Sequence, residues 1–280
     1  MATASQDRIL PLHLTPIEKF LLADDRPRHP MAFVIDMTFS GVVDRAAFEE
    51  AMAEAARRHP LIVALVRPAK RKALCWVSSK GQLPYVDWAE EHVPVTLPHG
   101  EWINLHDEVG LRLWIRQGPE RAQVTAQFHH VCCDGIGAYR FLGDLLAIYG
   151  ARTSVEEPRP TMETVTLSKL RGRADGCSYL HGTGQNGREI RASLKLLYRI
   201  IGRGCSPLSP SKPPGRTADY PGYCSFTFDQ TEFKQLRDAA SGLGAMVNDL
   251  LAIELFYVMH QWNVARRRFR LGQRYRIMMP

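Results

Sequence analysis

The chain has 280 residues, of which 45% are hydrophobic and 23% charged, and its formal net charge is +7. This is ordinary globular composition, and the modest positive charge permits an anionic partner without requiring one. No apolar run approaches the roughly 18 residues of a membrane-spanning helix, and the N-terminus does not have the pattern of a secretory signal. Six irregularly spaced cysteines without a CxxC pair argue against a disulfide framework. We therefore expect a cytoplasmic protein with no transmembrane segment.

The first 150 residues predict an α/β unit. Thr15 and Pro16 begin a helix over 14–25, and Asp44 caps a second helix over 45–58. Alternating apolar residues predict a strand over 31–40 that buries one face. The other predicted elements are strands over 59–67, 73–79, 111–117 and 121–130, and a helix over 136–149 with Ile136, Leu142, Leu145, Leu146 and Tyr149 facing inward. Because these strands are not all parallel, the expected class is α/β with a mixed sheet.

Residues 151–221 are rich in proline, glycine and polar side chains, so we expect a connector that is partly disordered, with one basic helix over 188–202. Order is expected to return over 222–280. There the predicted elements are a strand over 223–229, a helix opened by the pair Asp229 and Glu232, a helix over 245–262 and a strand over 274–280. These are too few to repeat the first unit. Either these elements pack onto the first unit, or they are an incomplete second lobe of a two-lobe protein.

The stretch "FHHVCCDG" at 128–135 joins a predicted strand to a predicted helix. Neighbouring histidines on a strand point to opposite faces, and the sequence has no second His/Cys cluster, so we expect no metal site. A thiol nucleophile at Cys132 or Cys133 would need a base such as His130. A purely structural turn would use Asp134 as the helix cap. The fourth reading is general base catalysis by His130 near neutral pH.

"HHVCCDG" resembles the HHxxxDG signature of the chloramphenicol acetyltransferase-like superfamily. That superfamily includes nonribosomal peptide condensation domains and the wax ester synthase/diacylglycerol acyltransferases. Three further segments are similar to family segments: "LTPIEKFLLADDRPRHPM", "SGVVDRAAFEEAMAEAARRHPLI" and "MVNDLLAIELFYVMHQW". The resemblance implies two similar lobes with a tunnel between them.

The resemblance also implies a chemistry for this chain. His130 would be the general base that deprotonates an alcohol or amine acceptor. The acceptor would then attack an acyl thioester of coenzyme A or of a carrier-protein phosphopantetheine arm. His129 and Asp134 would be architectural, with Asp134 paired to an arginine, and Gly135 would turn the backbone and leave room beside the thioester. No metal and no tightly bound cofactor are implied.

Two departures from the family pattern bear on these expectations. Ile62 stands where the family usually has an arginine, which leaves Arg67 as the nearest partner for Asp134. No Asp-Phe-Gly-Trp-like loop is present, so the second lobe, 222–280, is expected to be incomplete. An alternative function is therefore a non-catalytic fragment or degenerate binding module of the same fold. The arginine-rich stretch 265–276 lacks an accompanying nucleic-acid motif, so no nucleic-acid partner is expected.

Overall fold

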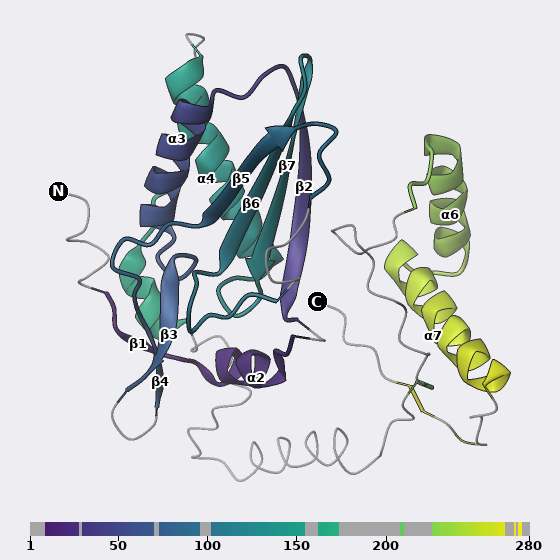
Figure 1. Cartoon of the computed structure of the whole chain (residues 1–280). Helices are drawn as coiled ribbons and strands as arrows, with labels where there is room; N and C mark the ends of the chain where they lie inside the picture. The colour runs from purple at the N-terminus through teal and green to yellow at the C-terminus, as the bar shows by residue number, and fades with distance from the viewer. Residues whose placement is uncertain are drawn as a thin grey trace. The chain divides into compact units, whose positions relative to one another are not determined.

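The structure is a computed structural model of the chain (Figure 1). It describes residues 9–27, 30–69, 73–95, 102–154, 162–173, 208–209, 226–266, 272 and 274–275. The chain divides into two compact units. Unit 1 comprises Met1–Gly176 with Ala218–Pro221, and unit 2 comprises Cys177–Thr217 with Gly222–Pro280.

Unit 1 contains two sheets. The larger has the order β2-β7-β6-β5, in which only β5 and β6 run parallel; its strands are β2 (Ala32–Ser40), β5 (Tyr85–Glu90), β6 (Leu111–Gln117) and β7 (Arg121–His129). The smaller has the antiparallel order β1-β4-β3, from β1 (Leu12–His13), β3 (Ala64–Pro68) and β4 (Leu74–Ser78). Both the mixed pairing and the α/β class are confirmed.

Helices α3 (Arg45–Arg58) and α4 (Gly135–Thr153) cover one face of the large sheet (Figure 1). Apolar side chains from both helices and from β6 and β7 make the main core; the helices contribute Phe48, Ala51, Met52, Ala55, Phe141, Leu142 and Leu145. A second core surrounds the small sheet and includes Trp76 and Leu61. Helix α2 (Pro16–Asp24) begins at Thr15 with the expected cap, and the 3₁₀ helix η2 (Leu167–Gly172) lies inside the expected connector.

Several boundaries differ from the prediction. Residues 59–63 form a turn, in which the Ile62 N–H bonds to the His59 carbonyl oxygen, and the strand begins only at Ala64. Strand β5 was not predicted, because "YVDWAE" mixes acidic and apolar residues without clear alternation. Ile136 was expected to face inward but is 69% exposed, because it lies in the first turn of α4, before the helix packs on the sheet.

Unit 2 contains α6 (Gln230–Gly242) and α7 (Val247–Ala265). The capping box of Asp229 and Glu232 is confirmed by its two reciprocal hydrogen bonds of 2.9 and 2.8 Å. The expected strand over 223–229 is wrong for residues 226–229, which have no strand pairing. Its first three residues, the expected helix over 188–202 and most of the expected strand over 274–280 lie outside the described residues.

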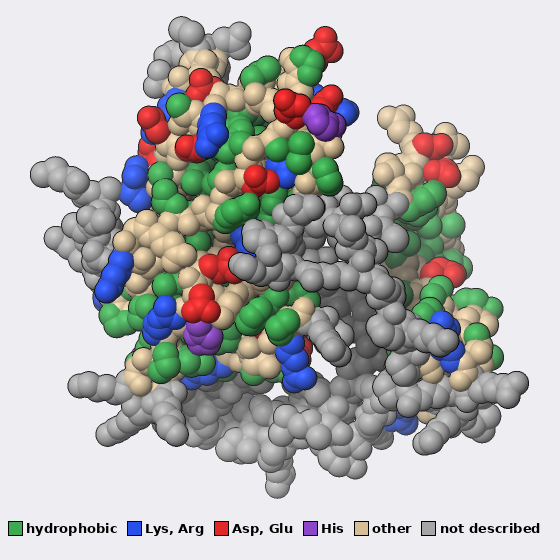
Figure 2. All heavy atoms as spheres, in the orientation of Figure 1, with side chains coloured by type: hydrophobic (Ala, Val, Ile, Leu, Met, Phe, Trp, Pro, Cys, Tyr) green, Lys and Arg blue, Asp and Glu red, His purple; other side chains and the backbone are tan. Residues whose placement is uncertain are grey.

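Within the described ranges, no single helix has the length and apolarity to cross a membrane. Helices α6 and α7, bent by 91° at their junction, meet that test of length and composition only as a pair. On the face drawn in Figure 2, basic and acidic side chains of unit 1 are interspersed. Among the described residues visible in this view, the basic side chains do not form one broad patch.

A shared carboxylate ties α3 to α4. Asp144 Oδ2 accepts from Arg58 Nε at 2.7 Å and lies 2.9 Å from His59 Nε2. Burial lowers the pKa of His59 from its ordinary 6.5; Asp144 opposes the shift, whereas the charges of Arg58 and Arg140 reinforce it. The folded protein thus favours neutral His59.

This shift predicts a pH dependence of stability. Since the folded pKa of His59 lies below its unfolded value, the unfolded chain binds this proton more readily, and the free energy of unfolding falls as the pH drops through 6.5. Urea denaturation between about pH 8 and pH 5 measures this slope. The His59→Gln protein, which keeps a donor for Asp144, should show a shallower slope. Identical slopes for the two proteins would contradict the assignment.

Candidate functional site

The histidine motif forms a turn between β7 and α4. Strand β7 ends at His129, and Asp134 caps α4 by accepting a 2.8 Å hydrogen bond from the Gly137 N–H. The His130 N–H donates to the Met31 carbonyl oxygen at 2.7 Å, which fastens the turn to the start of β2. The strand–turn–helix setting and the capping role of Asp134 are as the sequence predicted.

His129 is completely buried beneath this turn. Its Nδ1 accepts a hydrogen bond of 3.2 Å from the Val131 N–H, so the proton of the neutral ring is on Nε2. Nε2 lies 3.3 Å from Asp25 Oδ2, a contact that is long and poorly aligned for a hydrogen bond. The contact is therefore mainly an electrostatic attraction between the carboxylate and the Nε2–H side of the ring.

Asp25 lies just past the end of α2, and its carboxylate is well supplied with donors. Oδ1 accepts from the Met31 N–H at 2.8 Å, and Oδ2 accepts from the Trp102 indole at 2.6 Å. Burial alone would raise the pKa of Asp25, but His129 and these two donors outweigh it, so the pKa is lowered. Asp25 is thus a carboxylate at neutral pH. It joins α2, β2 and β7 at one point.

His130 has the opposite environment, because its side chain is exposed. The imidazole packs edge-on against Phe33, with ring centroids 5.2 Å apart, and Phe33 stacks on Phe128 in the core. Among the residues that the structure describes, neither ring nitrogen of His130 has a hydrogen-bond partner. The hydrogen bond that fixes an imidazole in one tautomer is made by His129, not by His130. The nitrogens of His130 are open to a ligand.

The two cysteines of the motif do not support the thiol-nucleophile alternative. Burial raises the pKa of Cys132 well above its ordinary value, and Cys133 and Glu18 add to the effect. Burial, with the nearby charge of Asp134, raises the pKa of Cys133 to about 12. Both thiols are therefore protonated at neutral pH. Within the described ranges, no group of three or more His, Cys, Asp or Glu side chains is placed to hold a metal ion.

Gly135 does not have the role in turning the backbone that was predicted for it. Gly135 has no positive φ, and a Cβ added there would meet nothing within 4 Å, so the turn does not require a glycine at that position. The space around Gly135 remains open. The crowded position is Gly110, where an added Cβ would overlap the Cys132 sulfur. Gly110 also accepts the His129 N–H at 2.9 Å, so it lies directly against the motif.

Arg67 does not complete the motif. It lies on β3, where its Cα is paired with that of Cys75, and no ion pair joins it to Asp134 among the described residues. The structure thus brings together His129, His130, Asp134 and Gly135 in one turn, without Arg67. The sequence reasoning did not identify Asp25 or Trp102, because 104 and 27 residues separate them from His129 and nothing in the sequence marks such long-range partners.

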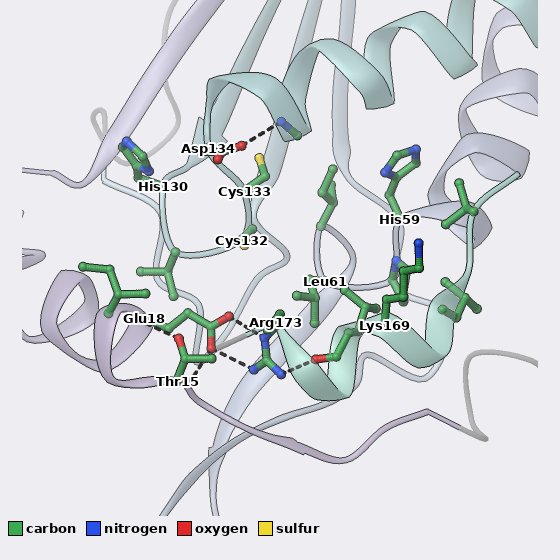
Figure 3. A pocket seen from close by; sticks show the side chains of 18 of the residues that line it. Thr15, Glu18, His59, Leu61, His130, Cys132, Cys133, Asp134, Lys169 and Arg173 are labelled. Carbon is green, nitrogen blue, oxygen red and sulfur yellow. Dashed lines mark hydrogen bonds and ion pairs between the residues drawn. The ribbon is translucent and has the colours of Figure 1, made fainter. Parts of the chain in front are cut away.

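A cavity of about 530 Å³ opens beside the turn (Figure 3). His130, Cys133 and Asp134 lie at one end, and His59 and Lys169 lie at the other. Between them the wall is largely apolar, from α2, from the turn after α3 and from the segment 162–173. A concave, mainly apolar cavity with a few polar groups is the usual form of a small-molecule site. His59 and Lys169 gave no signal in the sequence, since a single histidine or lysine is not distinctive.

Comparison with known proteins identifies the fold. No family model and no curated protein matches the chain. Among solved structures, it is similar to the first condensation domain of the calcium-dependent antibiotic synthetase, with a TM-score of 0.64, 13% identity, and coverage of 92% of this chain and 62% of that one. The X-domain from teicoplanin biosynthesis is similar with a TM-score of 0.61 and 16% identity, and the match covers 90% of this chain and 57% of that one.

Polyketide synthase associated protein 5 from Mycobacterium tuberculosis is also similar, with a TM-score of 0.55, 14% identity, and coverage of 90% of this chain and 58% of that one. The chain therefore has the mixed α/β fold of condensation domains. It spans less than two thirds of the length of each of these structures.

Gly110 provides a test of how the motif is packed. Gly110→Ala should destabilise the protein by about 1–3 kcal/mol, because the methyl group and the Cys132 sulfur compete for one space. Adding Cys132→Ala, which removes the sulfur, should restore part of the loss. The control is Gly143→Ala in α4, where nothing lies within 4 Å and alanine favours the helix. Equal stability of the two single variants in thermal unfolding would show that Gly110 is not crowded.

Proposed function

We propose that this chain is a condensation-type acyltransferase in which His130 is the general base. The observation that carries the proposal is the pairing of two unlike histidines in one turn. His129 is buried and bonded, whereas His130 is exposed at the cavity with both ring nitrogens open. A rigid turn that presents an unbonded imidazole to a ligand cavity is well suited to proton transfer. The shared fold with condensation domains supports the same reading.

In the proposed reaction, the acyl donor is a thioester of coenzyme A or of a carrier-protein phosphopantetheine arm. A ring nitrogen of His130 takes the proton of an alcohol or amine as its oxygen or nitrogen attacks the thioester carbonyl. The tetrahedral intermediate collapses, the carbon–sulfur bond breaks, and the proton on His130 passes to the departing thiolate. The products are an ester or amide and a free thiol. The step needs no metal, and the motif thiols take no covalent part.

The electrostatics of the turn support different roles for His129 and His130. Asp25, a buried carboxylate at neutral pH, faces His129 and not His130. Asp134 is engaged as the cap of α4. His130 is held in place by its backbone bond to Met31 and by the face of Phe33, which do not occupy its nitrogens. Positioning and proton transfer are therefore the contributions that this chain supplies.

The alternative is a binding module that holds a thioester without turning it over. Within the described residues Asp134 has no arginine partner, which is the observation that favours this reading. The two functions differ in whether the bound thioester is turned over to release a thiol. A binding module would bind acyl-coenzyme A equally well with and without the imidazole and would release no thiol.

The decisive variant is His130→Ala. Thiol release from a panel of acyl-coenzyme A thioesters, measured in the presence of alcohols and amines, should fall by about 10²–10⁴-fold because the proton acceptor is lost. The thermal unfolding midpoint should be unchanged, since the ring is exposed. His92→Ala, which removes an exposed histidine that does not line the cavity, is the matched control. Unchanged acyl transfer by the His130→Ala protein would refute the proposal.

A further inference from the structure

The segment 162–173 forms one wall of the cavity. It falls within the stretch expected to be a connector, yet Val165, Leu167 and Leu170 line the cavity opposite α2 and the motif turn. Leu170 also packs against the second core. Figure 3 shows Lys169 at the end of the cavity near His59 and Arg173 pointing toward Glu18. This segment is therefore a structural part of the cavity and not only a connector.

An ion pair anchors this wall to α2. Arg173 Nε and Nη2 each lie 2.8 Å from a different oxygen of Glu18, and the two side chains are only 15% and 10% exposed. Arg173 also donates to the carbonyl oxygens of Leu170 and His13. Glu18 in turn accepts from the Thr15 N–H at 2.7 Å and from the Trp76 indole at 3.2 Å. This bidentate ion pair, in which both side chains also make further hydrogen bonds, holds the wall against α2.

A second anchor lies near the start of the segment. Arg58 Nη2 donates to the Glu163 carbonyl oxygen at 2.5 Å, while its Nε is bound to Asp144. The segment is thus fixed near its start to Arg58 and at its end to Glu18 of α2, and both residues also line the cavity. These two anchors hold the segment that contributes Leu167 to the lining of the cavity.

The charges of the lining select against a cationic ligand. Glu18 and Asp134 are the acidic residues that line the cavity, and both are engaged, one by Arg173 and the other by the N-terminus of α4. Arg58, Lys169 and Arg173 bring positive charge to the same lining. The ammonium ion of an aminoacyl group would face three cations and two carboxylates in this lining, and one of the carboxylates, Glu18, is already paired with Arg173. An uncharged hydrocarbon chain can pack on the apolar side chains of the lining and on the protonated thiols.

We propose that this cavity receives an apolar acyl chain, and that Leu167 limits the chain length. The inference rests on the proposed function, because the thioester carbonyl at the head of the chain is the group placed at His130. The chain then runs between α2 and the segment 162–173 toward the end marked by His59. The donor class is a fatty-acyl thioester rather than an aminoacyl thioester.

Binding separates this inference from the proposed chemistry. In the His130→Ala protein, which keeps the cavity, octanoyl-coenzyme A should bind at least about tenfold more tightly than acetyl-coenzyme A by isothermal titration calorimetry. Alanyl-coenzyme A should bind no better than acetyl-coenzyme A. Adding Leu167→Trp, which fills the cavity, should remove the preference for octanoyl while leaving acetyl binding within about twofold.

The matched control is Ser168→Trp, which places the same bulk on the same 3₁₀ turn at an exposed position outside the lining. It should keep the octanoyl preference. Leu167→Ala provides a second variant should the tryptophan disturb folding, and it should extend the preference to longer chains. Equal binding of octanoyl and acetyl thioesters, tighter binding of the alanyl thioester, or an unaltered preference in both Leu167 variants would overturn the inference. None of these results depends on turnover, so loss of the proposed activity would be recognised separately.

Discussion

The site depends on the buried contact between Asp25 and His129. The carboxylate lies past the end of α2, the imidazole lies at the end of β7, and the backbone N–H of Met31 and the Trp102 indole complete the cluster. A carboxylate that is kept ionised by such donors attracts the Nε2–H side of the ring, while the Val131 N–H binds Nδ1. These contacts fix the His129 ring beneath the turn, and the next residue, His130, is exposed on that turn.

Helix α2 links the two walls of the cavity. Its capping-box residue Glu18 holds Arg173 and so the segment 162–173, and Asp25 just past its other end holds His129. Removing one partner of a buried ion pair typically costs about 3–5 kcal/mol, because the remaining charge is left uncompensated. The nine residues of α2 consequently set the distance between the proposed base and the proposed acyl-chain wall. The length and capping of this short helix therefore bear on the geometry of the cavity.

Local patterns predicted many of the helix starts and strands. Thr15, Asp44 and Asp229 were identified as helix caps because capping needs only neighbours within three residues, and β2, β6 and β7 were identified by their alternation. The motif itself predicted a strand–turn–helix with Asp134 as cap. Non-local features were not predicted. The bond between Arg173 and Glu18 spans 155 residues, and the crowding of Gly110 by Cys132 depends on packing that no sequence window contains.

The predictions that were wrong also failed because they depended on backbone pairing and tertiary packing. "HPLIV" is apolar enough for a strand, but Pro60 cannot donate to a ladder and the segment turns instead. Gly135 was assigned a steric role from its place in the motif, whereas the available space shows that Gly110 has that role. Arg67 was chosen by proximity in sequence, and strand pairing places it opposite Cys75. The sequence thus predicted the strand–turn–helix at the motif, whereas tertiary packing determines which residues contact this turn.

The most direct test is a crystal structure of the chain with an octanoyl-coenzyme A analogue in which a methylene group replaces the thioester sulfur. The account predicts that the carbonyl group lies beside the His130 imidazole and that the hydrocarbon chain lies between α2 and the segment 162–173. An analogue bound with its acyl group away from His130, and with this cavity unchanged, would contradict the account.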